Sequence, residues 1–488
     1  MPIIPNSLKF DELFVISDLH FGGEAGFQIF ASTSEMVALI KHIGALPASM
    51  HAALLINGDF IDFLAEKPQR HFDPDGANAK LDRIAADATF KPIFEALSDL
   101  LGIANRTLLI NLGNHDLELA MPWVREHLSH ILCGIGVAKI EIDAAKRGRL
   151  QFHTDGTGVR CRVGASEVLV LHGNEFDAWN VADYHHLRTM ARDLQFGKPV
   201  KDWEPNAGSR MVIEVMNEIK RERPFVDLLK PEMGAVVKVL GLMKLGYLKK
   251  LRDVADFGAR AAYDAGRMKM NLLSVGANPE LLDASPSKFV TENQFLDALY
   301  NDADVAQNLQ NTEQFEDARM LGITAAILQK VKGSSECEVL RVALDSLLKD
   351  QSFAFGDADD TYKSASAALS SDLPFVITGH THLLRAISRP RGGYFNSGTW
   401  ARLIQVNPAN LVDEQSFQPI YRALMAKTLP EIDSIQEVTK QSVVQKICPV
   451  VHLQTQGDKV IGRLARVAKE GGEFKLLDID HAPQFQGK

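Results

Sequence analysis

The sequence has few cysteines, no long apolar run and no excess of positive charge. Its four cysteines, among 488 residues, form no Cys-x-x-Cys pair, so neither a disulfide framework nor a structural zinc site is indicated. No stretch of about 18 uncharged apolar residues occurs, which argues against a membrane span. The N-terminus lacks a basic region followed by an apolar one, so no signal peptide is expected. Together these absences favour a cytoplasmic protein.

The net charge of the chain is −9, with 62 acidic residues against 53 lysines and arginines. This sign does not favour nucleic acid as a partner, because the phosphate backbone attracts basic surfaces. Apolar residues make up 46 % of the chain, enough to bury a large core. The length predicts either roughly two to four domains or one elaborated domain.

What the sequence does contain is five short polar fragments, each directly after an apolar run typical of a strand. They cover residues 18–20, 58–62, 113–116, 172–174 and 379–382. Helical patterns alternate with the first four strands, so we expect an α/β fold with mostly parallel pairing near the fragments. Functional groups collect at the carboxyl ends of the strands in such sheets, which predicts that the fragments meet at one site.

The strands and helices of this body can be placed by their residue patterns. Strands are expected at 13–17, 53–57, 107–112, 168–171 and 375–378, with one more strand and a turn at 393–400. Helices are expected at 34–43, 79–100 and 123–132.

Between the fourth and fifth fragments the pattern becomes helical, with examples at 211–223, 226–251, 253–271 and 315–332. An insertion of this length is too large for a loop, and we interpret it as a cap or lid. The expected organisation is a body over 1–183 and 372–404, a helical insertion over 184–371 and a C-terminal extension over 405–488. The extension should hold a helix near 419–427. It should also hold a β-hairpin that either extends a body sheet or forms a small accessory unit.

Residues 233–251 of the insertion combine apolar side chains with four lysines. One interpretation is a surface for lipid or an acidic substrate, which would permit peripheral membrane contact. The other is a helix that packs inward and leaves its lysines in solvent, the commoner arrangement for an amphipathic helix.

The fragments carry oxygen and imidazole groups of the kind that bind divalent ions. The candidate ligands are Asp18, His20, Asp59, Asn114, His172, His380 and His382. Asp18 and His20 are two residues apart, a spacing that directs both side chains to one side of an extended chain, so both can reach one ion. His380 and His382 have the same spacing, so one turn could serve both ions. The carboxylate of Asp59 could bridge two ions, which predicts a site for two divalent metal ions.

Catalytic residues are expected beside these ligands. His115 is placed to bind a phosphate oxygen or to protonate the leaving oxygen, and Asp116 could orient it. Asp62 could orient a metal ligand by a hydrogen bond, without contacting the metal itself. Glu175 and Asp177 could shape the site, although acidic residues at a strand end are more often caps.

Residues after the last fragment have both a functional and a structural interpretation. Those that could bind a second phosphate, or else lie in solvent, are Arg385, Arg389 and Arg391. Those that could approach the site, or else form a turn, are Asn396, Ser397 and Thr399.

At these residues the chain resembles the calcineurin-like metallophosphoesterase superfamily, whose pattern is D-x-H, GD-x-x-D, GNH-D/E, H and GH-x-H. The resemblance covers roughly residues 10–180 and 372–402. It implies a four-layer α/β sandwich of two mixed sheets flanked by helices, and two ions, commonly Mn, Fe or Zn, with Mn favoured here. By motif position, His115 matches the catalytic histidine of the family. One ion would be held by Asp18, His20, Asp59 and His382, and the other by Asp59, Asn114, His172 and His380.

Within the superfamily, the lid placement is similar to that of bacterial UDP-2,3-diacylglucosamine pyrophosphohydrolases. The chain departs from them in length, in Asn174 where they have Asp, and in His115 where they often have Arg. It resembles the protein phosphatases less, because Phe63 and Leu64 stand where they have Arg-Gly. It also differs from nucleases of the superfamily, whose extra domain follows the last motif.

The resulting expectation is a metal-dependent phosphohydrolase in which a hydroxide between two ions attacks phosphorus. The substrate would be a phosphorylated small molecule with a phosphodiester or pyrophosphate bond, such as a nucleotide or nucleotide-lipid. The alternatives are a nuclease and a phosphomonoesterase. A non-catalytic scaffold is less favoured, because no ligand of the pattern is missing.

Overall fold

The computed structural model describes residues 8–230, 333–344, 352–436 and 442–487, apart from 137, 138, 140, 178, 200 and 201, and also 236, 239 and 347. The helices predicted at 253–271 and 315–332 lie outside these residues, as does nearly all of the lysine-rich segment 233–251.

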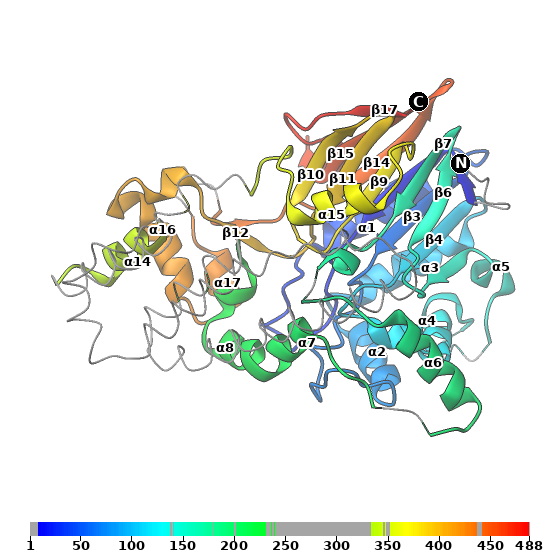
Figure 1. Ribbon diagram of the computed structural model, residues 1–488, viewed down its shortest axis with the longest axis horizontal. Coiled ribbons are helices and arrows are strands. Elements are labelled where there is room, and N and C mark those ends of the chain that lie inside the picture. The colour runs from blue at the N-terminus through cyan, green and yellow to red at the C-terminus, as the bar shows by residue number, and fades with distance from the viewer. Residues whose placement is uncertain are drawn as a thin grey trace.

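The larger of the two main sheets has eight strands, seven of them in the order β16-β15-β14-β2-β3-β4-β5, with β17 paired to β15 (Figure 1). Their bounds are β2 Glu12–Ile16, β3 Ala52–Asn57, β4 Arg106–Asn111, β5 Leu150–His153, β14 Pro449–Gln456, β15 Lys459–Glu470, β16 Glu473–Asp478 and β17 Phe485–Gly487. β2 to β5 run parallel, as predicted. β14 pairs antiparallel with β2, so the C-terminal hairpin extends a sheet of the body.

The smaller mixed sheet has six strands in the order β1-β6-β7-β9-β11-β10. Their bounds are β1 Leu8–Phe10, β6 Val159–Val163, β7 Ser166–Val170, β9 Phe375–Thr378, β10 Leu384–Arg389 and β11 Gly392–Ser397. β7 and β9 are parallel neighbours. The fourth and fifth polar fragments, which follow these two strands, therefore leave the sheet at the same edge.

Both faces of the central strands are buried, which explains why their sequences are apolar throughout. Successive side chains of a strand point to opposite faces. Val15 of β2 therefore joins a cluster with Val170 and Phe375 of the smaller sheet, whereas its neighbours Phe14 and Ile16 join a cluster with the helices.

Helices flank both sheets. The cluster of Phe14 includes Leu39, Leu97 and Leu128, and on the other sheet Ala365 packs with Val376. The helices concerned are α1 Thr33–Gly44, α2 Ala77–Ala86, α3 Lys91–Gly102, α4 Pro122–Cys133 and α15 Asp360–Ala368. The protein is thus mixed α/β with mixed sheets flanked by helices, as predicted at this level. The helical segment expected at 79–100 is divided into α2 and α3.

A further hydrophobic cluster joins segments that are distant in the sequence. Ile219 and Leu340, from the predicted insertion, pack in it with Ile420 and Ile432, from the predicted C-terminal extension. A three-stranded sheet in the order β13-β12-β8 lies beside it. The elements are α8 Asn217–Glu222, β8 Leu229–Lys230, α14 Glu336–Leu344, β12 Leu403–Gln405, α16 Glu414–Met425, α17 Leu429–Asp433 and β13 Val444–Gln445. In Figure 1, α14 and α16 lie together on the side of the body opposite α5 (Ala144–Arg147).

The helix predicted to begin at residue 226 is wrong at its start. Residues Pro224–Asp227 form a 3₁₀ turn, and Leu229–Lys230 form strand β8. The backbone N–H of Ile404 donates to the carbonyl oxygen of Leu228 at 2.6 Å, so pairing with β12 overrides the local helical pattern. In the described residues no helix combines the length and apolar character needed to cross a bilayer.

Candidate metal centre

The five polar fragments meet at the ends of their strands. The backbone N–H of Asp18 donates to the carbonyl oxygen of Gly58 at 3.2 Å, and that of His20 donates to Asp59 at 2.9 Å. The N–H of Gly379 donates to the carbonyl oxygen of His172 at 2.7 Å. The loops after β2 and β3 are therefore held together, as are those after β7 and β9.

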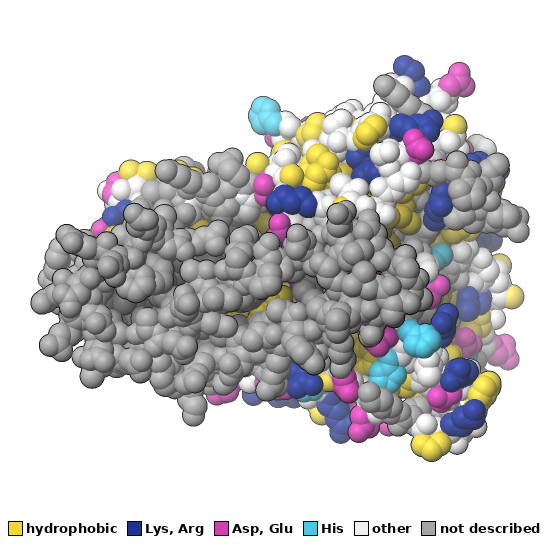
Figure 2. All heavy atoms as spheres, in the orientation of Figure 1, with side chains coloured by type: hydrophobic (Ala, Val, Ile, Leu, Met, Phe, Trp, Pro, Cys, Tyr) yellow, Lys and Arg dark blue, Asp and Glu magenta, His cyan; other side chains and the backbone are white. Residues whose placement is uncertain are grey.

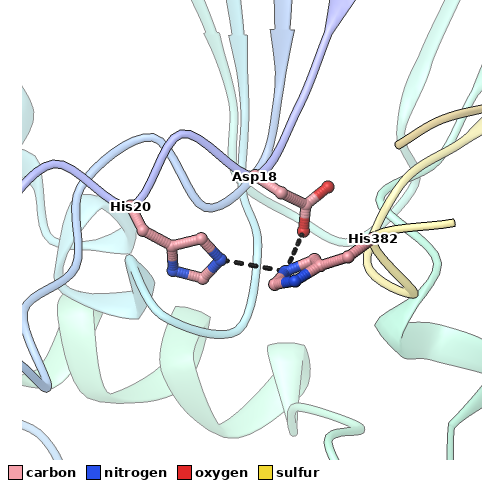
Figure 3. Close-up of side chains that lie close together, drawn as sticks. All are labelled: Asp18, His20 and His382. Atoms are coloured by element: carbon pink, nitrogen blue, oxygen red, sulfur yellow. Dashed lines mark hydrogen bonds and ion pairs between the residues drawn. The ribbon is translucent and has the colours of Figure 1, made fainter. Parts of the chain in front are cut away.

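Asp18, His20 and His382 form the first group of potential ligands (Figure 3). Nε2 of His382 lies 3.1 Å from Nε2 of His20 and 3.3 Å from Oδ1 of Asp18. The three side chains come from the loops after β2 and β9 and point toward one another. One ion could be bound by all three.

Asp59, His172 and His380 form a second group of potential ligands. Oδ2 of Asp59 lies 3.3 Å from Nε2 of His172 and 3.8 Å from Nε2 of His20. Asp59 thus lies between the two groups. This is the position that a bridging carboxylate requires, and both groups are largely buried.

Five of the predicted ligands adopt left-handed backbone conformations, which are uncommon for residues other than glycine. Their φ angles are 54° for Asp18, 50° for His20, 51° for Asp59, 69° for His380 and 61° for His382. The extended geometry expected for Asp18 and His20 is therefore wrong, whereas His380 and His382 were expected in a turn. Left-handed residues beyond the strand ends, not an extended strand, bring each pair to the site. Such strained positions cluster at functional sites.

Each of three ligand histidines has a partner for its outer ring nitrogen. Nδ1 of His172 lies 2.7 Å from the carbonyl oxygen of Asn57, and Nε2 of His380 lies 2.8 Å from Oδ2 of Asp177. Nδ1 of His20 lies 3.2 Å from Oδ2 of Asp62. Such contacts fix the tautomer and leave the other nitrogen as a lone-pair donor for a metal.

Several buried polar atoms of the fragments have no hydrogen-bond partner within the described part of the chain. They are Asp18 Oδ1, Asn114 Oδ1, His172 Nε2 and His382 Nδ1. An unsatisfied buried polar atom ordinarily costs about 1–3 kcal/mol, so four of them in one place require an explanation. A divalent cation fits, because carboxylate, amide oxygen and imidazole are ligands that Mn, Fe and Zn accept.

Glycine is needed where the backbone passes close to two ligands. A Cβ on Gly58, which has a φ of 79°, would lie 2.3 Å from Nδ1 of His172. A Cβ on Gly113 would lie 2.2 Å from Oδ1 of Asp59. Both contacts are far inside van der Waals distance, so a side chain at either position would displace a ligand.

His115 lies beside this centre, but Asp62 rather than Asp116 contacts its ring. Oδ1 of Asp62 is 3.2 Å from Nδ1 of His115. The carboxylate of Asp116 instead accepts the backbone N–H groups of Gly113, at 2.6 Å, and Phe60, at 2.9 Å. Asp116 thus braces the loops that carry the ligands, and its catalytic role remains a prediction.

The charges of the site shift the pKa of several groups. Burial lowers the pKa of His115, but Asp62 and Asp59 outweigh it and raise the value to about 9. Burial, supported by the charge of Asp59, raises the pKa of Asp116 to about 7. Burial and the charge of Lys230 lower the pKa of His382 to about 4. At neutral pH His115 is therefore a proton donor, whereas His382 is a neutral imidazole suited to bind a metal.

Two candidate ligands differ in whether a cation must displace a proton to bind them. Burial raises the pKa of Asp18, but the neighbouring His382 and His172 together outweigh it and the value falls to about 2. Burial lowers the pKa of His172, but the charge of Asp59 raises it to about 10. A metal must displace the proton of His172, so binding should release protons.

The acidic residues after His172 divide between the two interpretations. Asp177 contacts the ligand His380, as described above, and so shapes the site. Oε2 of Glu175 accepts the backbone N–H of Gly173 at 2.7 Å, a local contact of the capping kind.

Three residues after the last fragment, Asn396, Ser397 and Thr399, are buried and support the loops that carry the candidate ligands. Oγ1 of Thr399 donates to the carbonyl oxygen of Asp18 at 2.8 Å, and Nδ2 of Asn396 donates to that of Gly379 at 2.8 Å. Ser397 lies 2.7 Å from Ser17, whose hydroxyl also donates to Asp18.

Neither interpretation of the first two arginines is correct. Arg385 is buried and bound to Asp357 and Asp359, while Arg389 is buried and donates to the carbonyl oxygen of Ser370 at 2.9 Å. Arg391 is exposed, as the solvent interpretation expects.

Sequence patterns missed two lysines that the fold brings to the centre. Lys220, from α8, lines a pocket with His20 and Asp62. Lys230, from β8, is buried and close enough to His382 to depress its pKa. Neither belongs to a polar fragment. The only signal was their position in a locally basic segment.

Neither the protein-family models nor the curated protein sequences compared with this chain give a match. The functional interpretation therefore depends on the residues and their geometry.

Proposed function

We propose that this chain is a metal-dependent phosphohydrolase of the calcineurin-like metallophosphoesterase superfamily, acting on a phosphodiester or pyrophosphate bond of a small molecule. The observation that carries the proposal is the convergence of two buried Asp/His groups around Asp59, with unpaired ligand atoms among them. With it we propose the four-layer sandwich of that superfamily, and a helical insertion over 184–371 that covers the site.

Two divalent ions, with Mn favoured, would be held by the two groups together with Asn114. When bound, such ions would stabilise charge on phosphate oxygens and lower the pKa of the attacking water. The protein's own residues then have separate tasks. His115, held by Asp62, donates a proton to the leaving oxygen. Asp177 and the carbonyl oxygen of Asn57 keep two ligand histidines in the required orientation.

A nuclease is the second candidate, and the described part of the face shown in Figure 2 does not favour it. On the face shown in Figure 2, Lys and Arg side chains are interspersed with Asp and Glu over the coloured residues. Binding of a long polyanion favours a continuous basic stripe. A phosphomonoesterase would use the same ligands. Comparing the hydrolysis of a phosphomonoester with that of a phosphodiester would distinguish the two activities.

The proposal is tested by removing metal with a chelator, adding Mn²⁺ back and measuring hydrolysis of bis(p-nitrophenyl) phosphate. Activity should disappear on chelation and return with Mn²⁺. Asp59→Asn should lower kcat/KM at least about 100-fold, because it removes the charge between both groups. The matched control is Asp458→Asn, in the exposed turn between β14 and β15, which should retain activity. Full activity in chelated protein and in Asp59→Asn would refute the proposal.

A further inference from the structure

A pocket opens beside His20 and Asp62, next to the candidate metal centre. The loop after β2 forms one wall, the segment after Asp62 forms another, and α8 with the turn that follows it forms the third. His20 is a candidate ligand and Asp62 holds His115. A group in this pocket would therefore be adjacent to the phosphorus that reacts.

The acidic side chains of the pocket wall already have cationic partners. Asp62 contacts the two histidines described above, and Glu24 pairs with Lys67. Asp227 lies 2.9 Å from Nζ of Lys220. These pairs neutralise the acidic residues, so the wall is not simply repulsive to an anion.

Two consecutive cations, Lys220 and Arg221, project from α8 into the wall. Arg221 is exposed and makes no ion pair with the described residues. Lys220 is partly buried and lines the pocket together with Asp62, the carboxylate that contacts the ring of His115. Lys220 therefore lies on the wall of the same pocket as the carboxylate that holds the predicted proton donor.

The remainder of the pocket is apolar. Phe27, whose exposed fraction is 38 %, lines it together with Ile29, Pro224 and Leu429. An organic group attached to an anion would find apolar contacts here, as small-molecule sites commonly provide beside a few polar groups.

We propose that this pocket receives the leaving half of an organic pyrophosphate, with Lys220 and Arg221 binding its second phosphoryl group. The inference rests on the proposed function and narrows its substrate to phosphoanhydrides. The two phosphorus atoms of a pyrophosphate share one oxygen. With the first phosphorus at the metal centre and the shared oxygen at His115, the second phosphoryl group would lie beyond His115 and Asp62, in the pocket that Lys220 and Arg221 line. Lys and Arg are the side chains that bind phosphate groups by charge.

The reaction balances as a hydrolysis. The oxygen of water forms a bond to the first phosphorus, and the bond from that phosphorus to the bridging oxygen breaks. The bridging oxygen leaves with the second phosphoryl group and takes the proton of His115. The proton released by water restores His115, and the products are two phosphomonoesters.

The test compares kcat/KM for diadenosine pyrophosphate and for bis(p-nitrophenyl) phosphate, which has a single phosphorus, both in Mn²⁺. Lys220→Met should lower the ratio of the first value to the second at least tenfold, chiefly through KM for the pyrophosphate. Lys220→Arg should restore most of the ratio, and Arg221→Met should lower it less. The matched control is Lys146→Met, a partly buried lysine on α5 (Ala144–Arg147) whose Nζ donates to Ser98 at 2.9 Å; its ratio should equal that of the wild type.

The outcomes separate the two proposals. If the wild type hydrolyses the aryl diester but not the pyrophosphate, the inference is overturned and the proposed function stands. The inference is also overturned, and the proposed function stands, if Lys220→Met lowers kcat/KM for both substrates by an equal factor and Lys220→Arg does the same. Both variants must then show the circular dichroism of the wild type. If the wild type hydrolyses neither substrate with Mn²⁺, the proposed function itself fails.

Discussion

At the scale of single residues, the candidate centre depends as much on atoms behind the ligands as on the ligands. Asp177 contacts His380, and the carbonyl oxygen of Asn57 contacts His172. Removal of such supporting contacts typically weakens metal affinity about 10- to 100-fold. The left-handed backbone of Asp59 and other ligands adds strain that surrounding hydrogen bonds must hold.

Glu118 is a buried carboxyl group outside the centre, and it should make stability depend on pH. Its Oε1 accepts the backbone N–H of Asp73 at 2.8 Å, and Lys80 lies 3.2 Å from the Asp73 carboxylate. Burial raises the pKa of Glu118 from 4.5 to about 7. The folded state thus keeps a proton that the unfolded state loses. The stabilisation is complete below pH 4.5 and disappears as pH rises through 7.

Glu118→Gln should remove this dependence, because the amide keeps the acceptor oxygen and does not titrate. The free energy of unfolding is measured with urea at pH 5 and at pH 8 for the variant and the wild type. The gain in stability of the variant over the wild type should be up to about 3 kcal/mol larger at pH 8 than at pH 5. Glu95→Gln, on the exposed surface of α3, is the control and should follow the wild type. Parallel curves for Glu118→Gln and wild type would contradict the prediction.

At the scale of elements, the C-terminal hairpin is part of the body's core. Leu453 of β14 pairs with Leu13 of β2 and is fully buried between the sheets. The strand next to the first polar fragment is thus held in place by residues near the other end of the chain.

Leu453→Ala should therefore destabilise the whole protein by about 2–5 kcal/mol, the usual cost of truncating a buried leucine. Urea unfolding monitored by circular dichroism measures the loss. Val412→Ala, at a side chain that is 70 % exposed, should change stability by less than about 0.5 kcal/mol. A comparably small loss for Leu453→Ala would show that the hairpin is an independent unit.

The hydrophobic cluster beside the three-stranded sheet joins residues of the predicted insertion to residues of the predicted C-terminal extension. Ile219 and Leu340 share it with Ile420 and Ile432. The pocket of Lys220 also includes Leu429 of α17, so residues on both sides of the last polar fragment form its walls.

At the scale of the whole molecule, folding and metal binding should be linked. The candidate ligands follow the ends of five strands in two sheets, so the centre exists only in the folded state. A metal at 100 times its dissociation constant should then stabilise the protein by about 2.7 kcal/mol. Thermal unfolding should occur at a higher temperature in Mn²⁺ than in chelator.

The control for this linkage is Asp59→Asn, which should show little difference between Mn²⁺ and chelator because one carboxylate between the two groups is lost. Equal melting temperatures of the wild type in Mn²⁺ and in chelator would argue against a metal centre. The measurement is independent of any substrate.

The sequence by itself determined the candidate ligands and the strands that precede them. An apolar run followed by a polar fragment is a local pattern, and local patterns set where a buried strand ends. β2, β3, β4, β7 and β9 end within one residue of the predicted positions for this reason.

Only the tertiary structure decided which groups support those ligands. Asp62 rather than Asp116 contacts His115, Asp177 contacts His380, and Arg385 is buried with acidic partners. The contacts of Asp62 and Asp177, like the approach of Lys220 to the site, join segments far apart in the chain. Their energies depend on positions that the packing of two sheets sets, and no local pattern encodes those positions.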